Sequence, residues 1–157
     1  METLEDLLEK LNSPSAPTRY TTANKLGKLG DKGAVDGLLE AARDDDEKVA
    51  DNAIFALGEL GDMRAAPSLV KILRMGKNPR VRKSAAKALG MLKARGAVDA
   101  LVLALRDADF NVRKSAARSL GQIADKKAAP ALQDALKDPN YTVVKYVEDA
   151  IDRIQGL

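Results

Sequence analysis

The stretch Val81-Arg82-Lys83-Ser84-Ala85-Ala86 decides the fold, because it occurs again 31 residues later as Val112-Arg113-Lys114-Ser115-Ala116-Ala117. An internal period of this length is the signature of a repeat architecture. Steps of 31 or 32 residues carry the register along the chain and align Thr18, Val49, Val81, Val112 and Val143. The sequence therefore predicts a stack of similar units.

Each unit is predicted to contain two helices. In the second unit, Val49, Ala53, Leu57 and Leu60 form the apolar stripe of an amphipathic helix. Gly61-Asp62 then offers a left-handed C-cap followed by a cap for the next helix. Prolines such as Pro67 and Pro130 stand near the start of the second helix, where a missing N–H is tolerated. We expect ten to eleven helices and no strand.

The chain is expected to form a single domain, 1–157, with four full repeats between two capping helices. One 32-residue interval places an extra residue between Arg74 and Arg80. The expected boundaries are a capping helix in 1–15, repeats at 16–46, 47–78, 79–109 and 110–140, and a closing helix in 141–157.

A glycine recurs inside the first helix of all four repeats, at Gly27, Gly58, Gly90 and Gly121. Glycine in a helix interior costs about 1 kcal/mol relative to alanine. Its presence at one repeat position in four copies predicts that a neighbouring helix approaches closely there.

Composition argues against several function classes. The chain has no Cys, so disulfides and thiolate sites are excluded, and no His, which is the usual general base and the commonest metal ligand. No apolar run is long enough to span a bilayer, and the acidic start of the chain is unlike a signal peptide. The acidic run Asp44-Asp45-Asp46-Glu47 lacks the spacing of a calcium loop and is interpreted as a solvated linker. We therefore expect a cytoplasmic protein that is not an enzyme, with no catalytic site, metal or cofactor.

The pattern Val-Arg-x-x-Ala-Ala-x-Ala-Leu-Gly-x-Leu, followed by Gly-Asp and then Ala-Val or Ala-Ala-Pro, resembles the HEAT-like repeats of the phycobilisome-lyase class. It is also similar to artificial alpha-repeat scaffolds. The resemblance covers nearly the whole chain and departs at Lys93-Ala94 and at Thr18-Arg19-Tyr20. It implies an all-α fold, a right-handed α-solenoid of two-helix repeats.

The resemblance also bears on chemistry. HEAT-type hydroxylases bind iron through paired His-Glu motifs, and this chain has no His. Bilin lyases of this class are usually longer and act as pairs of subunits, and no motif here identifies a bilin site. In the artificial scaffolds, the outward positions of each first helix form a variable concave binding surface.

All five aromatic residues of the chain fall at such outward positions. Exposed Tyr and Phe on one surface are typical of binding hot spots. The predicted partner-binding residues on this face are Tyr20, Asn24, Asp51, Asn52, Phe55, Lys83, Lys87, Phe110, Lys114, Arg118, Tyr141, Lys145 and Tyr146.

Charge is uneven along the same surface. Residues 77–118 contain 11 basic and three acidic side chains, although the whole chain carries only +3. Glu47, Asp51 and Glu59 form an acidic shoulder beside this basic centre. The distribution indicates a protein partner with an acidic patch.

We therefore predict a monomeric, non-catalytic scaffold that binds another protein through its concave face. Three alternatives stay open. They are nucleic-acid binding through the basic stretch 77–118, a lyase- or chaperone-like role for a chromophore protein, and a repeat protein engineered without a natural partner.

Overall fold

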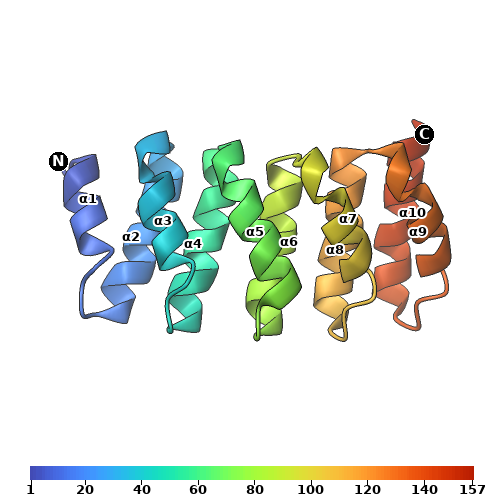
Figure 1. The fold of residues 1–157 in the computed structure, drawn as a ribbon, viewed down its shortest axis with the longest axis horizontal. Coiled ribbons are helices and arrows are strands. Elements are labelled where there is room, and N and C mark those ends of the chain that lie inside the picture. The colour runs from blue at the N-terminus through green and yellow to red at the C-terminus, as the bar shows by residue number, and fades with distance from the viewer.

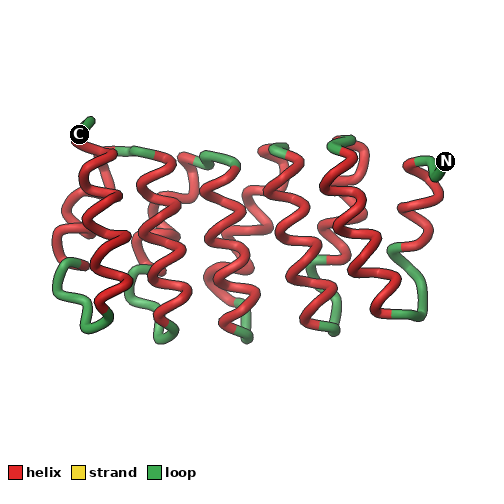
Figure 2. Tube along the Cα trace, turned by 180° about the vertical axis from the view of Figure 1, so that it is seen from behind, coloured by secondary structure: helices red, strands yellow, loops and turns green.

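A computed structural model describes all residues, 1–157, and is entirely helical. Two layers of helices stack side by side, as Figures 1 and 2 show from opposite faces. The first-helix layer consists of α2 (Ala16–Leu29), α4 (Glu47–Leu60), α6 (Pro79–Met91), α8 (Phe110–Ile123) and α10 (Tyr141–Gln155). The second-helix layer consists of α3 (Val35–Ala41), α5 (Ala66–Met75), α7 (Val98–Ala104) and α9 (Ala129–Ala135). The predicted all-α solenoid of two-helix repeats is confirmed.

Two kinds of smaller element complete the stack. Helix α1 (Leu4–Lys10) covers the exposed side of α2 at the N-terminal end (Figure 1). A one-turn 3-10 helix precedes each second helix, at Lys32–Ala34, Met63–Ala65, Arg95–Ala97 and Lys126–Ala128.

The turns between helices follow the capping chemistry that the sequence indicates. Gly61 ends α4 with a φ of 68°, and the Asp62 side chain accepts a hydrogen bond from the Arg64 N–H. Where the pattern departs, Lys93 itself takes a positive φ of 50°, and Ala94 provides no capping hydrogen bond. The fold therefore tolerates the departure by placing a non-glycine residue in the left-handed region, which has a cost that glycine avoids.

The extra residue of the second repeat has a local effect. Helix α5 is 10 residues long, whereas α3, α7 and α9 each have 7. Gly76 then leaves the helix with extended backbone.

The helices of the first layer approach one another closely because small residues face each other. The core is one cluster of 41 buried residues, mostly Ala, Leu and Val. A Cβ at Gly121 would lie 3.0 Å from the Cα of Ala150, and a Cβ at Gly58 would lie 3.2 Å from the Cα of Ala88. The packing role predicted for the glycines is confirmed.

Gly58→Leu is expected to destabilise the protein, because the added side chain must push α4 and α6 apart. Overpacking of this kind costs about 1–3 kcal/mol. Thermal and urea unfolding followed by circular dichroism would measure it. Gly96→Leu is the matched control, since nothing lies within 4 Å of a Cβ there. Equal stabilities of the two variants would contradict the packing role.

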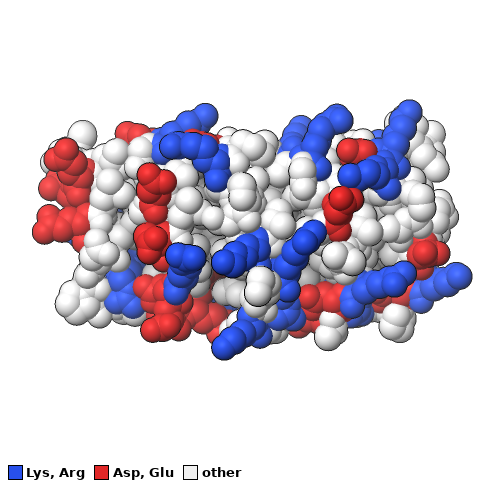
Figure 3. All heavy atoms as spheres, viewed as in Figure 1, with Lys and Arg blue, Asp and Glu red and all other residues white.

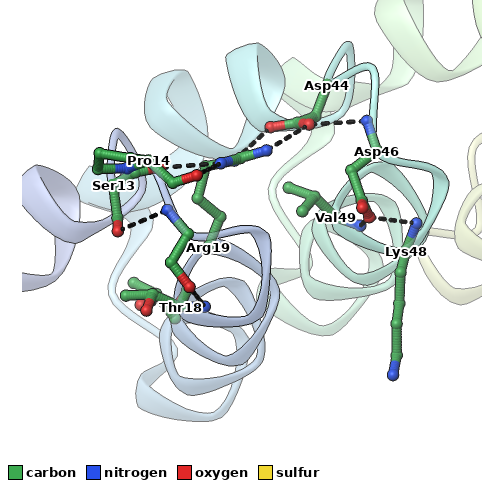
Figure 4. Close-up of polar contacts among 10 residues, drawn as sticks. Ser13, Pro14, Thr18, Arg19, Asp44, Asp46, Lys48 and Val49 are labelled. Carbon is green, nitrogen blue, oxygen red and sulfur yellow. Dashed lines mark hydrogen bonds and ion pairs between the residues drawn. The ribbon is translucent and has the colours of Figure 1, made fainter.

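A repeated arginine–aspartate staple joins successive linkers at one edge of the stack. Figure 4 shows Arg19 between the Ser13 and Pro14 carbonyls and the Asp44 carboxylate. The Arg19 Nε–Asp44 Oδ2 distance is 2.8 Å, and Asp44 also accepts from the Asp46 N–H. Two equivalent staples, Arg82–Asp107 and Arg113–Asp138, span the same 25 residues. Each staple therefore fixes the linker before its repeat to the linker after it.

The second repeat lacks both the arginine and the aspartate of this staple. Ala50 stands at the arginine position, and Gly76 stands in the linker where Asp44, Asp107 and Asp138 occur in the others. A lone arginine or aspartate would leave a partly buried charge without its partner, which is costly. The loss of both residues together avoids that cost.

Arg82→Met is expected to lower the free energy of unfolding by about 1.5–3 kcal/mol, the range for hydrogen bonds to charged groups. Burial alone would raise the pKa of Asp107, but its hydrogen bonds with Arg82 and the Asp109 N–H outweigh burial and hold the pKa below its usual value. A lowered aspartate pKa stabilises the fold above the pKa of the unfolded chain, near 3.8, and that contribution is lost as pH falls further.

The stability difference between wild type and Arg82→Met should therefore be full at neutral pH and shrink below about pH 4. Urea unfolding across this pH range would measure it. Arg106→Met is the control, because Arg106 is exposed and forms no ion pair. A difference that does not change with pH would show that Arg82 acts by packing alone.

Candidate functional site

The predicted binding residues lie on the outward side of the first-helix layer, which we call the first-helix face. None of the thirteen is buried. Phe55, Phe110 and Tyr141 are exposed by 46%, 41% and 72% of their surface. Tyr20 and Tyr146 differ, because both are partly buried and pack against the core. The first-helix face therefore offers three open rings and two that also support the fold.

Two adjoining pockets on this face meet at Phe55 and Lys87 and form what we call the Phe55–Lys87 groove. The pocket between α4 and α6 measures about 190 Å³, and the pocket that reaches α8 measures about 160 Å³. The first is lined by Asp51, Asn52, Phe55, Lys83, Ser84 and Lys87. The second is lined by Phe55, Lys87, Met91, Arg118, Ser119 and Gln122. The groove thus joins residues from three successive repeats.

Four cations surround this groove: Lys83, Lys87, Lys114 and Arg118. None of them forms an ion pair. Partial burial, and then the charges of Lys83, Arg118 and Lys114, lower the pKa of Lys87, while Asp51 opposes the shift. The cluster therefore holds uncompensated positive charge that an anion would stabilise.

The acidic shoulder is less open than its sequence indicates. Arg80 contacts the Asp51 carboxylate at 2.9 Å and Glu47 at 3.8 Å. Ser84 also donates a hydrogen bond to Asp51. Two of the three shoulder carboxylates are therefore occupied by the neighbouring repeat.

The remaining predicted residues lie outside the groove. Lys114 Nζ lies 5.8 Å from the centre of the Tyr146 ring, and Lys145 Nζ lies 5.2 Å from that of Tyr141. At the other end of the face, Lys48 Nζ lies 4.3 Å from the Tyr20 ring. Asn24 and Phe110 line neither pocket of the groove.

Sequence reasoning missed part of the groove. Met91 and Gln122 are not among the thirteen predicted residues, although each lies one helical turn after a predicted one, Lys87 and Arg118 respectively. Ser119 was not expected in the groove because it belongs to the core-facing stripe of α8 and is buried. Its hydroxyl donates to the Ala86 carbonyl at 2.6 Å. The repeat register also places Arg80 on this face, outside the groove, and only its contact with Asp51 comes from the tertiary structure.

Two equivalent serines meet different neighbours. Ser84 on α6 finds the carboxylate of Asp51 on α4. Ser115, its equivalent on α8, is 2% exposed and its hydroxyl has no partner. The repeat register places Lys83 where Asp51 stands one repeat earlier, and lysine offers no acceptor. Lys83 thus leaves a buried hydroxyl unsatisfied.

Ser115→Ala is expected to raise the free energy of unfolding by about 1–2 kcal/mol, because it removes a buried unsatisfied polar group. Ser84→Ala should have the opposite sign and lower it by about 0.5–1.5 kcal/mol through loss of the hydrogen bond to Asp51. Chemical unfolding of the two matched variants would measure both. Changes of the same sign would contradict the assignment of Ser115 as unsatisfied.

The opposite, second-helix face has a different character. Figure 3 shows basic and acidic side chains interspersed over it, with acidic ones gathered at the α1 end. A pocket of about 500 Å³ lies between α7 and α9, beside the exposed Leu103. No group of three or more His, Cys, Asp or Glu side chains is arranged so that it could hold a metal ion, and none of the helices has the length and apolarity to span a membrane.

The stacked two-helix units define a helical repeat protein. Residues 4–90 and 67–152 match the family of HEAT repeats. This chain belongs to that family.

Two curated relatives and one solved structure are informative. The chain is 36% identical over 102 residues to deoxyhypusine hydroxylase of Arabidopsis thaliana, a match covering 63% of this chain and 32% of that protein. It is 34% identical over 112 residues to phycocyanobilin lyase subunit alpha of Nostoc sp., covering 66% and 40%. A chain in the structure of the CpcE–CpcF complex of phycocyanin lyase from Nostoc sp. PCC7120 superposes with a TM-score of 0.87 at 28% identity, covering 100% of this chain and 66% of that one.

These findings confirm the resemblance to the phycobilisome-lyase class. An engineered protein with a TM-score of 0.70 at 26% identity extends the likeness to artificial repeat proteins. The chain spans less than half the length of the curated relatives it matches.

The expectation that this chain is not an enzyme is contradicted. Both curated relatives carry enzymatic names, and the superposed structure belongs to a lyase. That expectation rested on the absence of His and Cys from the chain, and the names of the relatives overturn it. An iron centre of paired His-Glu motifs still does not fit these residues, since the chain has no His and no cluster of alternative ligands.

Proposed function

We propose that this chain acts as a subunit of a bilin-lyase-type enzyme, with the Phe55–Lys87 groove as its chromophore contact. The observation that carries the proposal is the superposition of the whole chain on a phycocyanin lyase chain with a TM-score of 0.87. The second named activity among its relatives, hydroxylation, has less support because the ligand set for iron is missing.

The groove has chemistry that suits a bilin. A bilin is a flat conjugated chain of rings that carries two carboxylates. Phe55 and Met91 offer apolar surface, while Lys87 and Arg118 stand at the same pocket with unpaired positive charge. A guanidinium binds a carboxylate with two parallel hydrogen bonds, and an aromatic ring stacks on a conjugated one. The groove is open, so it would hold part of the chromophore and leave the rest accessible to a partner protein.

A protein partner is part of the same proposal. The superposed lyase chain was solved in a complex of two proteins. The exposed rings of Phe110 and Tyr141 lie on the first-helix face outside the groove and provide contact surface of the kind that interfaces use.

Titration of the chain with phycocyanobilin, followed by visible absorption, would test the chromophore contact. We expect a saturable spectral change and a loss of affinity of about 2 kcal/mol in Phe55→Ala, the size typical of an aromatic hot spot. Leu103→Ala is the control, since Leu103 is exposed on the opposite face.

A second arm adds CpcF and apo-phycocyanin and measures covalent attachment of the bilin. Attachment that depends on this chain supports the lyase-type role. The proposal is wrong if the chain neither changes the bilin spectrum nor supports attachment.

A further inference from the structure

One column of outward positions on the first-helix face carries a lysine in three successive repeats. Lys83 on α6, Lys114 on α8 and Lys145 on α10 each stand two residues after the aligned valine. Equivalent positions of neighbouring repeats lie side by side, since α6 packs on α8 and α8 on α10. The three lysines therefore form a row across the stack, which we call the lysine row.

The charge of the lysine row is only partly compensated, since a hydrogen bond to Tyr141 and then the charge of Glu148 raise the pKa of Lys145. None of the three forms an ion pair. Lys114 and Lys145 instead approach the rings of Tyr146 and Tyr141, and Lys87 and Arg118 add positive charge one turn further along the same helices. The row ends at α4, where its equivalent is Asp51, already bound by Arg80 and Ser84.

Lys83 works against the stability of the fold. It adds like charge beside Lys87, and it stands where an acceptor for the buried Ser115 hydroxyl would be. A residue that breaks a local rule of folding without a structural gain is expected at a functional position. This cost points to a ligand for the lysine row.

The distance between neighbouring lysines of the row determines how far apart the negative charges of a matching ligand must be. Packed helices lie about 8–10 Å apart, and a peptide in the extended polyproline II conformation rises about 3.1 Å per residue with three residues per turn, so that every third side chain points the same way. Three residues of an extended peptide therefore span one helix-to-helix step. We propose that the lysine row binds an extended segment of a partner protein that carries an acidic residue at every third position.

The segment would cross α6, α8 and α10 with one carboxylate on each lysine. Tyr141 and Tyr146 flank the last two lysines and would contact the side chains between the acidic ones. The lysine row shares Lys83 with the Phe55–Lys87 groove, whereas Lys114 and Lys145 lie outside the groove and allow the proposal to be tested separately from the bilin-lyase role.

A fluorescently labelled peptide with four Glu-Ser-Gly triplets is the probe, and a peptide of the same composition with its four Glu residues consecutive is the matched control. Anisotropy titrations at moderate salt should give at least about tenfold tighter binding of the periodic peptide, because only it can pair with all three lysines. Equal affinities would overturn the proposal, since they would indicate attraction by net charge alone.

Lys114→Glu tests whether the central Glu of the peptide is aligned with the central lysine of the row. It should weaken binding of the periodic peptide by at least about tenfold, because it places like charges together in the centre of the row. A peptide with Lys in place of the central Glu should recover affinity for this variant and bind the wild type poorly. Lys71→Glu, on α5 of the opposite face, should change neither affinity by more than about twofold. Failure of the charge exchange would overturn the predicted register.

Two further measurements complete the test. Melting curves confirm that each variant is folded, and bilin titration of Lys114→Glu reports separately on the Phe55–Lys87 groove. A twelve-nucleotide oligothymidine is the competing ligand. If it displaces the periodic peptide and binds more tightly at the same salt concentration, the row is a nucleic-acid surface and the peptide proposal is wrong.

Discussion

The close approach of the first helices is the constraint on which the rest of the structure depends. Glycine and alanine face each other across the layer, as at Gly58 with Ala88 and Gly121 with Ala150. At such contacts a helix cannot shift without a clash, so each repeat is fixed on the previous one. The columns of outward residues keep a constant spacing for the same reason. The lysine row is proposed to bind a ligand whose charges have the same spacing as the lysines. Such binding requires the distance between neighbouring helices to be fixed.

The polar staples determine a second property, the relation between successive linkers. Where Arg19, Arg82 and Arg113 reach an aspartate 25 residues on, the linkers are connected through a partly buried charge pair. The second repeat has lost both partners of its staple and has gained residues in α5. The Phe55–Lys87 groove begins in this same repeat, at the junction of α4 with α6. The least regular repeat is therefore also the one that contributes the ring at the centre of the groove.

If the lysine row binds an anionic ligand as proposed, folding and binding make opposite demands on position 83. An acceptor at position 83 would satisfy Ser115 as Asp51 satisfies Ser84, and it would also dilute the positive charge near Lys87. The lysine found there leaves a buried hydroxyl without a partner and strengthens a surface for anions. The fold is also found in an engineered protein, so the fold alone does not define a function.

The sequence by itself determined the fold, because the same local sequence patterns recur in each helical repeat. Apolar stripes, the caps at Gly61-Asp62 and the glycine column could all be read from spacing, and so could the face on which Phe55 and Lys87 stand. Only the tertiary structure decided which outward residues share a pocket, because that depends on contacts between repeats. Arg80 bound to Asp51, Ser119 lining the groove and the unsatisfied Ser115 arise from such contacts. The repeat period predicts on which face of the stack a residue lies, but the neighbouring helix determines which groups its side chain contacts.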